Sequence, residues 1–318
     1  MPGSKTLAPA AYYPHIPDHF PNMKYPVGNE WTEERWLLGK KMFYDPVFSD
    51  DGLVSCASCH KPHLAFSDDR AFSVGSEGQF GRNNAPSLTN IGYHPYFTRA
   101  GGVPTLEMQV LVPIQEHDEF NTNILLIANK LNEDPEYVEM SRAAYGRPVD
   151  SYVITRALAN FERSLVSGDS PYDRYLAGDY DALSTSEKRG LELFNSDRLA
   201  CSKCHSGFNF TNYAFENNGL YASYKSEGRK RLTGLDADKA LFKVPTLRNI
   251  GVTAPYMHDG SLETLDDVLD HYNSGGYSHP NKSSMIRSLD MSEPELKDVR
   301  NFLLSLTDDS FINNPYFH

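Results

Sequence analysis

The sequence predicts a mainly α-helical protein made of two domains that share one plan. Three observations predict it. Apolar residues recur at helical spacing, capping signatures stand where the helical segments begin, and one short cysteine motif occurs twice, about one domain length apart. Strand signals are weak. The chain has 318 residues, 40% apolar and 23% charged, which is enough for two domains of ordinary size.

The helical signal is clearest in four segments. Residues 152–165 repeat apolar side chains at positions i, i+4, i+7 and i+11, which predicts one buried helix face. Three further helices begin with a capping box, in which a Ser or Thr precedes an acidic residue by three positions. These boxes are Ser184-Thr-Ser-Glu187, Thr264-Leu-Asp-Asp267 at the start of a helix through Tyr272, and Ser292-Glu-Pro-Glu295 at the start of the last helix, through Leu304.

All four cysteines fall into two copies of one motif, Cys56-Ala-Ser-Cys59-His60 and Cys201-Ser-Lys-Cys204-His205. A Cys-x-x-Cys pair alone fits a zinc site or a redox dithiol. A histidine directly after it is typical of haem c, whose vinyl groups take up the two thiols and whose iron takes the imidazole as proximal ligand. A Cys₄ zinc site is the alternative, but it leaves both histidines unexplained. We therefore predict two covalently attached haem c groups, one for each motif.

The approaches to the two motifs also match. Leu38-Gly-Lys-Lys-Met-Phe43 precedes the first motif and Arg189-Gly-Leu-Glu-Leu-Phe194 precedes the second, so one helix–turn–motif unit is used twice. The stretch 166–181 is rich in Gly, Ser, Asp and Tyr and marks the boundary between the units. We predict two cytochrome c-type domains, residues 1–170 and 171–318, each built around one covalently bound haem.

Composition excludes some partners. The formal net charge of −12 argues against nucleic acid or anionic lipid as the main partner. The apolar runs are too short to span a bilayer, so we expect no membrane insertion. Residues 1–6, Met-Pro-Gly-Ser-Lys-Thr, have no apolar core and no cleavage site, which leads us to expect that a targeting peptide has been removed.

Further short segments carry a family resemblance. They include Asn84-Ala-Pro-Ser-Leu-Thr-Asn90, Thr105-Leu-Glu-Met-Gln109, Val244-Pro-Thr-Leu-Arg-Asn249 and Ala254-Pro-Tyr-Met-His-Asp-Gly260. Together with the two motifs, they make the chain resemble the bacterial di-haem cytochrome c peroxidase and MauG superfamily from about Trp36 to Leu306. The segment 164–174 resembles the MbnH branch of that superfamily. The resemblance implies a periplasmic enzyme whose N-terminal haem reacts with hydrogen peroxide and whose C-terminal haem stores or relays an electron.

The resemblance also implies an acid–base pair on the distal side of the first haem. The family pair falls on Gln109 and Glu119, with Pro113 between them at the family spacing. Cleavage of the peroxide O–O bond needs a group that takes a proton from one oxygen and returns it to the other, as Glu119 can. Gln109 can orient the peroxide. The alternative is that Glu119 is a solvated surface acid beside Glu116 and Asp118.

The sixth iron ligands separate the branches of the superfamily. The position of the loop histidine of conventional peroxidases is Ser76, a poor ligand, so the first haem is expected to be five-coordinate or water-bound at rest. For the second haem, the ligand position of the resemblance is Tyr272, where conventional peroxidases carry methionine. A phenolate stabilises high-valent iron, whereas methionine favours the ferrous state. Met257 is the rival ligand, which we interpret as packing, and His271 is expected on another helix face.

The chain departs from the family where a tryptophan usually separates the haems. That position is Arg99, so electrons are expected to pass through Phe97 or Tyr96, or directly between haem edges.

An interfacial calcium is also implied by the resemblance. Its ligands would be Asn84 and the backbone carbonyls of Thr253 and Pro255, since oxygen donors suit a hard cation. The alternative is that Asn84 only closes a turn.

These features lead to one main interpretation and two rivals. In the main one, a MauG- and MbnH-like oxidase uses H₂O₂ to form a bis-Fe(IV) state that oxidises a partner protein, with Trp converted to kynurenine in an MbnP-like copper protein. In the first rival, a conventional peroxidase reduces H₂O₂ to water with electrons from a small cytochrome or cupredoxin. In the second, the chain is an electron carrier with both irons six-coordinate.

Overall fold

The structure of the chain is a computed structural model that describes residues 12–318, so the segment 1–6 discussed above lies outside the described residues. Helices dominate it, and the only strands among the described residues are β1 and β2, which form one short antiparallel pair. The elements are α1 Glu33–Tyr44, α2 Cys56–Cys59, α3 Leu106–Gln109, α4 Leu111–Gln115, α5 Ile124–Asn132, α6 Pro135–Tyr145, α7 Ser151–Arg163, α8 Pro171–Leu176, α9 Thr185–Asn195, β1 Phe215–Glu216, α10 Lys230–Thr233, β2 Phe242–Lys243, α11 Leu265–Ser274, α12 Glu293–Leu304 and α13 Asp309–Ile312.

The four predicted helices are confirmed. The segment 152–165 forms α7, and the three predicted capping boxes open α9, α11 and α12 with both reciprocal hydrogen bonds in place. The helix through Leu304 is not the last one, because α13 and a 3₁₀ turn, Pro315–Phe317, follow it. No helix in residues 12–318 has the length and apolar character needed to cross a bilayer.

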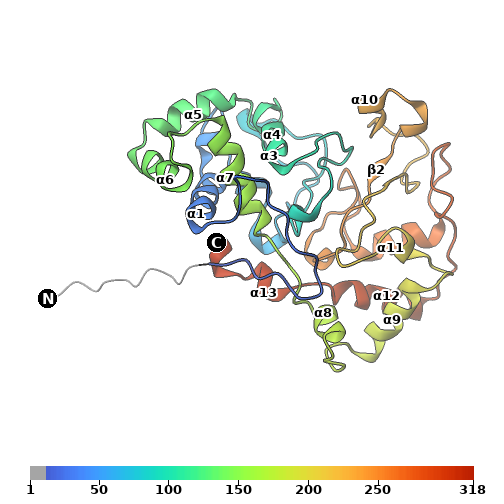
Figure 1. Cartoon of the computed structure of the whole chain (residues 1–318). Coiled ribbons are helices and arrows are strands. Elements are labelled where there is room, and N and C mark those ends of the chain that lie inside the picture. Colours follow the sequence, from blue (N-terminus) through green and yellow to red (C-terminus); the bar gives the residue numbers. More distant parts are fainter. Residues whose placement is uncertain (1–11) are drawn as a thin grey trace.

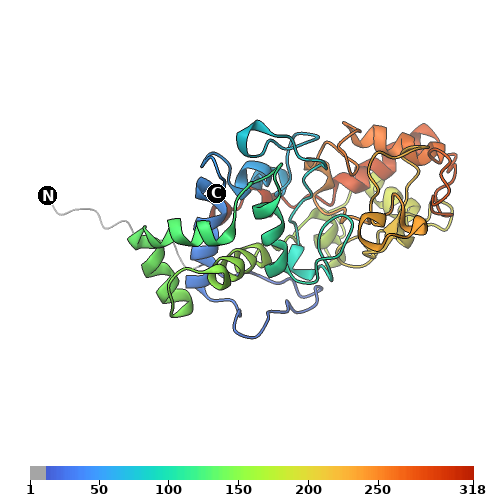
Figure 2. The same ribbon diagram turned by 90° about the horizontal axis from the view of Figure 1, so that it is seen from above.

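The two halves of the chain have separate cores. Helices α1, α5, α6 and α7 surround the first core, and α9, α11 and α12 surround the second. Figures 1 and 2 show these groups at opposite ends of an elongated molecule, with long loops between them. The chain leaves the first core after Leu165 and enters the second at Phe194.

A close helix crossing repeats in both halves and explains the repeated glycine of the sequence. A Cβ on Gly39 of α1 would overlap the carbonyl oxygen of Ala157 on α7, and a Cβ on Gly190 of α9 would overlap that of Asp298 on α12. Because glycine has no side chain, each helix pair can approach to backbone contact. In both halves, the crossing fixes the helix that leads into a haem motif.

The end of the chain returns to the first core. Phe311 of α13 and Phe317 are buried among first-core residues such as Phe66 and Phe161. In Figure 1 the C-terminus lies beside α1, and Figure 2 places it on the same side of the molecule. Residues 309–318 therefore pack with the first core. The predicted division into domains 1–170 and 171–318 does not include this return.

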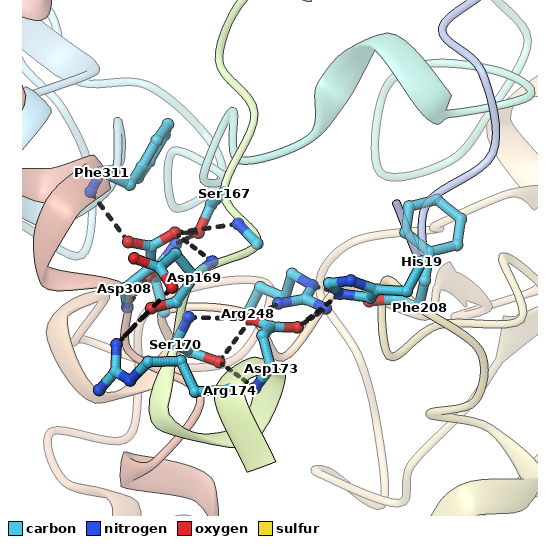
Figure 3. Close-up of polar contacts among 12 residues, drawn as sticks. His19, Ser167, Asp169, Ser170, Asp173, Arg174, Phe208, Arg248, Asp308 and Phe311 are labelled. Atoms are coloured by element: carbon cyan, nitrogen blue, oxygen red, sulfur yellow. Dashed lines mark hydrogen bonds and ion pairs between the residues drawn. The ribbon is translucent and has the colours of Figure 1, made fainter. Parts of the chain in front are cut away.

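The chain between the two cores is held by buried ionic groups, drawn in Figure 3. Arg248 forms two hydrogen bonds to Asp173 of α8, at 2.8 and 2.9 Å, and both side chains are almost fully buried. His19 contacts the same carboxylate at 2.9 Å. Asp308, just before α13, accepts hydrogen bonds from Ser167 and from the next two backbone amides. These contacts fix the chain segment between the two cores and the returning C-terminal segment against each other.

The helix crossing generates a stability prediction. Gly190→Ala gains about 1 kcal/mol of helix propensity, but its methyl group forces α9 away from α12, and overpacking of this kind costs about 1–3 kcal/mol or more. We expect a net loss of stability, measured as a lower midpoint in urea unfolding. Gly81→Ala is the control, because the nearest atom to its added Cβ is an ordinary 3.7 Å away. A variant at Gly190 that is as stable as the wild type would contradict the crossing.

Candidate functional site

Both cysteine motifs open onto one large cavity between the two cores. The cavity measures about 1370 Å³, more than the roughly 300–1,000 Å³ of a usual single-ligand pocket. The predicted site residues all line it, although they come from segments spread over most of the chain. They are Cys56, Cys59, His60, Asn84, Gln109, Glu119, Cys201, Cys204, His205, Thr253, Pro255 and Tyr272.

The two motifs have the same local structure. In each, the backbone N–H of the histidine donates to the carbonyl of the first cysteine at 2.9 Å. The imidazole Nδ1 of His60 then contacts the carbonyl oxygen of Phe66 at 2.8 Å, and that of His205 contacts the carbonyl oxygen of Phe210 at 3.1 Å. Nδ1–H therefore donates to the backbone, which leaves Nε2 with the lone pair that binds iron. Burial lowers the pKa of both imidazoles and so favours this neutral form.

The cavity fits haem and not zinc. Among residues 12–318, no three His, Cys, Asp or Glu side chains are grouped so that they could hold a metal ion, which removes the Cys₄ zinc alternative. Two oriented imidazoles and two unpaired cysteine pairs on one large cavity are what two covalently bound haems require.

Glu119 and Gln109 lie on the side of the first motif. Glu119 is an exposed residue that also lines the cavity, and neighbouring protein atoms partly desolvate its carboxyl group. This desolvation raises the pKa of Glu119 to about 7, and the charges of Glu116 and Asp118 add to the shift. The Oε1 atom of Gln109 is buried without a hydrogen-bond partner. A carboxyl group with a pKa near neutrality and a free amide oxygen thus line the same cavity, and their acid–base role stays a prediction.

Ser76 is turned away from the cavity. It is buried, and its hydroxyl accepts a weak hydrogen bond of 3.4 Å from the backbone N–H of Asp51. Its own N–H donates to the carbonyl of Glu119 at 2.7 Å, which ties the loop to the acid–base pair. The loop around Ser76 is therefore fixed by its backbone, and the serine hydroxyl contacts Asp51 instead of lining the cavity.

Tyr272 projects from α11 into the cavity beside the second motif. Burial raises the pKa of its phenol, whereas a hydrogen bond with the side chain of Asn218 acts in the opposite direction. The same amide group donates to Sδ of Met257 at 3.2 Å. The imidazole of His271 contacts the carbonyl oxygen of Asn218 at 3.0 Å and does not line the cavity. The structure thus offers two candidate ligands, Tyr272 and Met257, both held by one asparagine.

The predicted calcium ligands meet the cavity wall, but their arrangement does not fit a calcium ion. The side-chain oxygen and the backbone oxygen of Asn84 both accept hydrogen bonds from the guanidinium of Arg99. Calcium takes six to eight oxygen ligands and would need these lone pairs. The ligand role predicted for Asn84 therefore conflicts with its contacts, while Thr253 and Pro255 only line the cavity.

The surroundings of Phe97 and Tyr96 distinguish between the two aromatic side chains that were predicted to carry electrons near Arg99. Phe97 lines the cavity, and the ring of His94 stacks near it with 6.4 Å between centroids. Tyr96 does not line the cavity, because its ring stacks on Phe215 and its hydroxyl donates to the backbone of Tyr213. Phe97 is thus the aromatic candidate that the geometry favours.

Two residues of the site were missed by sequence reasoning. Glu162 of α7 lines the cavity, and desolvation raises its pKa to about 8, so it is mostly protonated at neutral pH. A signal for it existed, because a charged residue stands next to Phe161 on the apolar face of the predicted helix. Asn218, which holds both candidate ligands, lies in a loop and had no such signal.

The comparisons with known proteins agree with this geometry. A family profile described as di-haem cytochrome c peroxidase matches residues 33–181. The methylamine utilization protein MauG of Methylorubrum extorquens is 37% identical, over 90% of this chain and 81% of that protein. The cytochrome-c peroxidase IdrP1 of Pseudomonas sp. (strain SCT) is 31% identical, over 94% of this chain and 86% of that protein.

A solved structure is similar over nearly the whole chain. It is a MauG-like protein associated with microbial copper homeostasis, with a TM-score of 0.92 and 34% sequence identity, covering 97% of this chain and 99% of that one.

The raised pKa of Glu119 generates a prediction. Above about pH 7 this group is a carboxylate that can take the proton of peroxide, and below it the group is protonated. The rate of reaction with H₂O₂, followed by stopped-flow absorbance, should therefore rise with pH, with its midpoint near 7. Glu119→Gln should lower the rate by about 10²–10⁴-fold and remove this midpoint.

Glu116→Gln is the matched control. It removes a neighbouring negative charge, so the midpoint should move to lower pH while the maximal rate is kept. If the Glu119 variant reacted like the wild type, the acid–base role would be wrong.

Proposed function

We propose, from the premise that the chain belongs to the di-haem cytochrome c peroxidase and MauG family, that it oxidises a residue of a partner protein with hydrogen peroxide. Enzymes of this family are haem oxidoreductases that act with peroxide, and this chain is one of them. The finer assignment concerns where the oxidising equivalents go. One observation carries it: the phenol of Tyr272 lies in the cavity beside the second motif.

The residues of the first pocket support the peroxide step. The Glu119 carboxylate can take the proton from the near oxygen of peroxide and return it to the far oxygen, which leaves as water. The free oxygen of Gln109 can accept a hydrogen bond from peroxide and orient it. Glu162, protonated at neutral pH, adds no negative charge beside Cys56. When bound, the two haems supply storage for the two oxidising equivalents of peroxide.

The second pocket supports retention of oxidising equivalents over electron uptake from a small donor. A tyrosine oxygen stabilises high oxidation states of iron, whereas a thioether raises the reduction potential. Asn218 accounts for both groups. Its amide donates to Sδ of Met257, and its side chain also forms a hydrogen bond with the phenol of Tyr272, so it positions both side chains. On this ground we assign Tyr272 as the residue that would ligate the iron of the second haem and Met257 as packing.

The proposed substrate is a tryptophan of a copper-binding protein of the MbnP type, in the periplasm. Support comes from the solved structure with the TM-score of 0.92, whose description associates it with microbial copper homeostasis. The reaction balances with peroxide as the oxidant. Tryptophan and two H₂O₂ give N-formylkynurenine and two H₂O, and hydrolysis then releases formate and leaves kynurenine.

A conventional peroxidase is the second candidate function. Relatives named cytochrome-c peroxidases match this chain at identities similar to those of the MauG proteins, and Met257 also lines the cavity. A pure electron carrier is disfavoured, because Ser76 offers no ligand and the pair Gln109 and Glu119 faces the cavity.

One experiment separates these functions. Stoichiometric H₂O₂ is added to the all-ferric protein, and EPR and near-infrared absorption are recorded. We expect both ferric signals to be lost and a near-infrared band to appear without prior reduction. In Tyr272→Met the response should require reduction of one haem first. Tyr221→Phe, at another cavity tyrosine, is the control and should behave as wild type. A wild-type protein that stays silent until one haem is reduced would be a conventional peroxidase.

A further inference from the structure

We propose that the guanidinium of Arg99 replaces a metal ion as the cation that joins the two halves of this protein at Asn84. Arg99 donates three hydrogen bonds to Asn84. Nε and Nη2 reach its backbone oxygen at 3.0 and 2.7 Å, and Nη2 reaches Oδ1 at 3.1 Å. A planar guanidinium matches this pair of oxygens, since its N–H groups form a fixed fork.

The orientation of Asn84 is fixed from its other side. Its side-chain NH₂ donates to the carbonyl of Arg70 at 3.1 Å, so its Oδ1 must face Arg99. Its backbone N–H donates to the carbonyl of His258 at 3.0 Å, which belongs to the second half of the chain. Asn84 is buried, and every polar group it carries therefore has a partner without a metal ion.

The backbone beside Arg99 extends the same junction. The carbonyl of Arg99 accepts a hydrogen bond of 2.7 Å from the N–H of Lys243 on β2, and the carbonyl of Ala100 accepts one of 3.1 Å from Arg229. The ammonium group of Lys243 donates to the carbonyl of Tyr96 at 3.0 Å. The segment 96–100 thus carries contacts from its own half to Asn84 and from the other half through Arg229 and Lys243.

The local charge leaves little room for a divalent cation. Desolvation lowers the pKa of Arg99 to about 10, while Asp259 acts to raise it, so the guanidinium stays charged at neutral pH. Desolvation and the charge of Arg99 lower the pKa of Lys243 to about 8. A calcium ion on the oxygens of Asn84 would displace the hydrogen bonds of Arg99 and lie beside its positive charge.

The inference does not depend on the substrate or on the ligand of the second haem, and its test is independent of activity. Calcium is measured in the purified holoprotein by equilibrium dialysis against ⁴⁵Ca²⁺ and by mass spectrometry of the metal content. We expect no bound calcium in the wild type and no change in its EPR spectrum with a calcium chelator. Arg99→Trp frees the oxygens of Asn84, and we expect it to gain about one calcium per chain.

Further variants keep the test decisive. Arg99→Gln removes the charge with a smaller change of shape and should also gain calcium, which covers the case in which the tryptophan variant fails to bind both haems. Arg229→Gln is the matched control, because it removes an arginine hydrogen bond to the adjacent carbonyl without touching Asn84, and it should gain none. Calcium in the wild type, gain of calcium in the Arg229 variant, or its absence from folded Arg99 variants would each overturn the proposal.

Discussion

Two helix crossings without space for a single methyl group set the geometry on which the rest of the molecule depends. Gly39 and Gly190 bring α1 against α7 and α9 against α12 at backbone contact, and each crossing also packs the glycine on a phenylalanine, Phe161 or Phe302. Each glycine-bearing helix leads directly into a cysteine motif. Since packed interiors tolerate little displacement, the crossing fixes where the motif and its imidazole lie relative to the cavity. The glycine therefore occurs in both copies of the sequence unit because each helix crossing requires backbone contact.

Two titratable side chains of the cavity wall are kept largely neutral by burial. Burial makes Glu162 mostly neutral at physiological pH and lowers the pKa of His258 to about 4, which keeps that imidazole neutral as well. Glu119 is balanced near its titration point, which suits a group that must both accept and return a proton. Arg99 and Lys243, which also line the cavity, form contacts at the junction between the halves. The predicted acid–base residue and the junction residues therefore line one cavity.

The sequence predicted features that depend on local chemistry. The capping boxes at Ser184, Thr264 and Ser292 are four-residue signals, and the motifs at Cys56 and Cys201 encode their own turn, so both could be predicted without knowledge of the fold. What was missed depends on partners distant in the chain. The hydrogen bond of Asn218 to Met257 joins residues in different loops. The contact of Arg99 with Asn84 occupies a side chain that the family resemblance had assigned to calcium. The packing of Phe311 and Phe317 against the first core could not be predicted, because both residues lie in short turns without a periodic apolar pattern.

That return has a consequence for the order of events during biosynthesis. A chain that emerges N-terminus first exposes its first cysteine motif long before Phe317 has been made. The first core, however, includes Phe311 and Phe317 and stays incomplete until they arrive. The packing of the N-terminal half is therefore complete only after residues made late in synthesis have joined it. Phe311 and Phe317 therefore complete the first core only after the second half of the chain has been made.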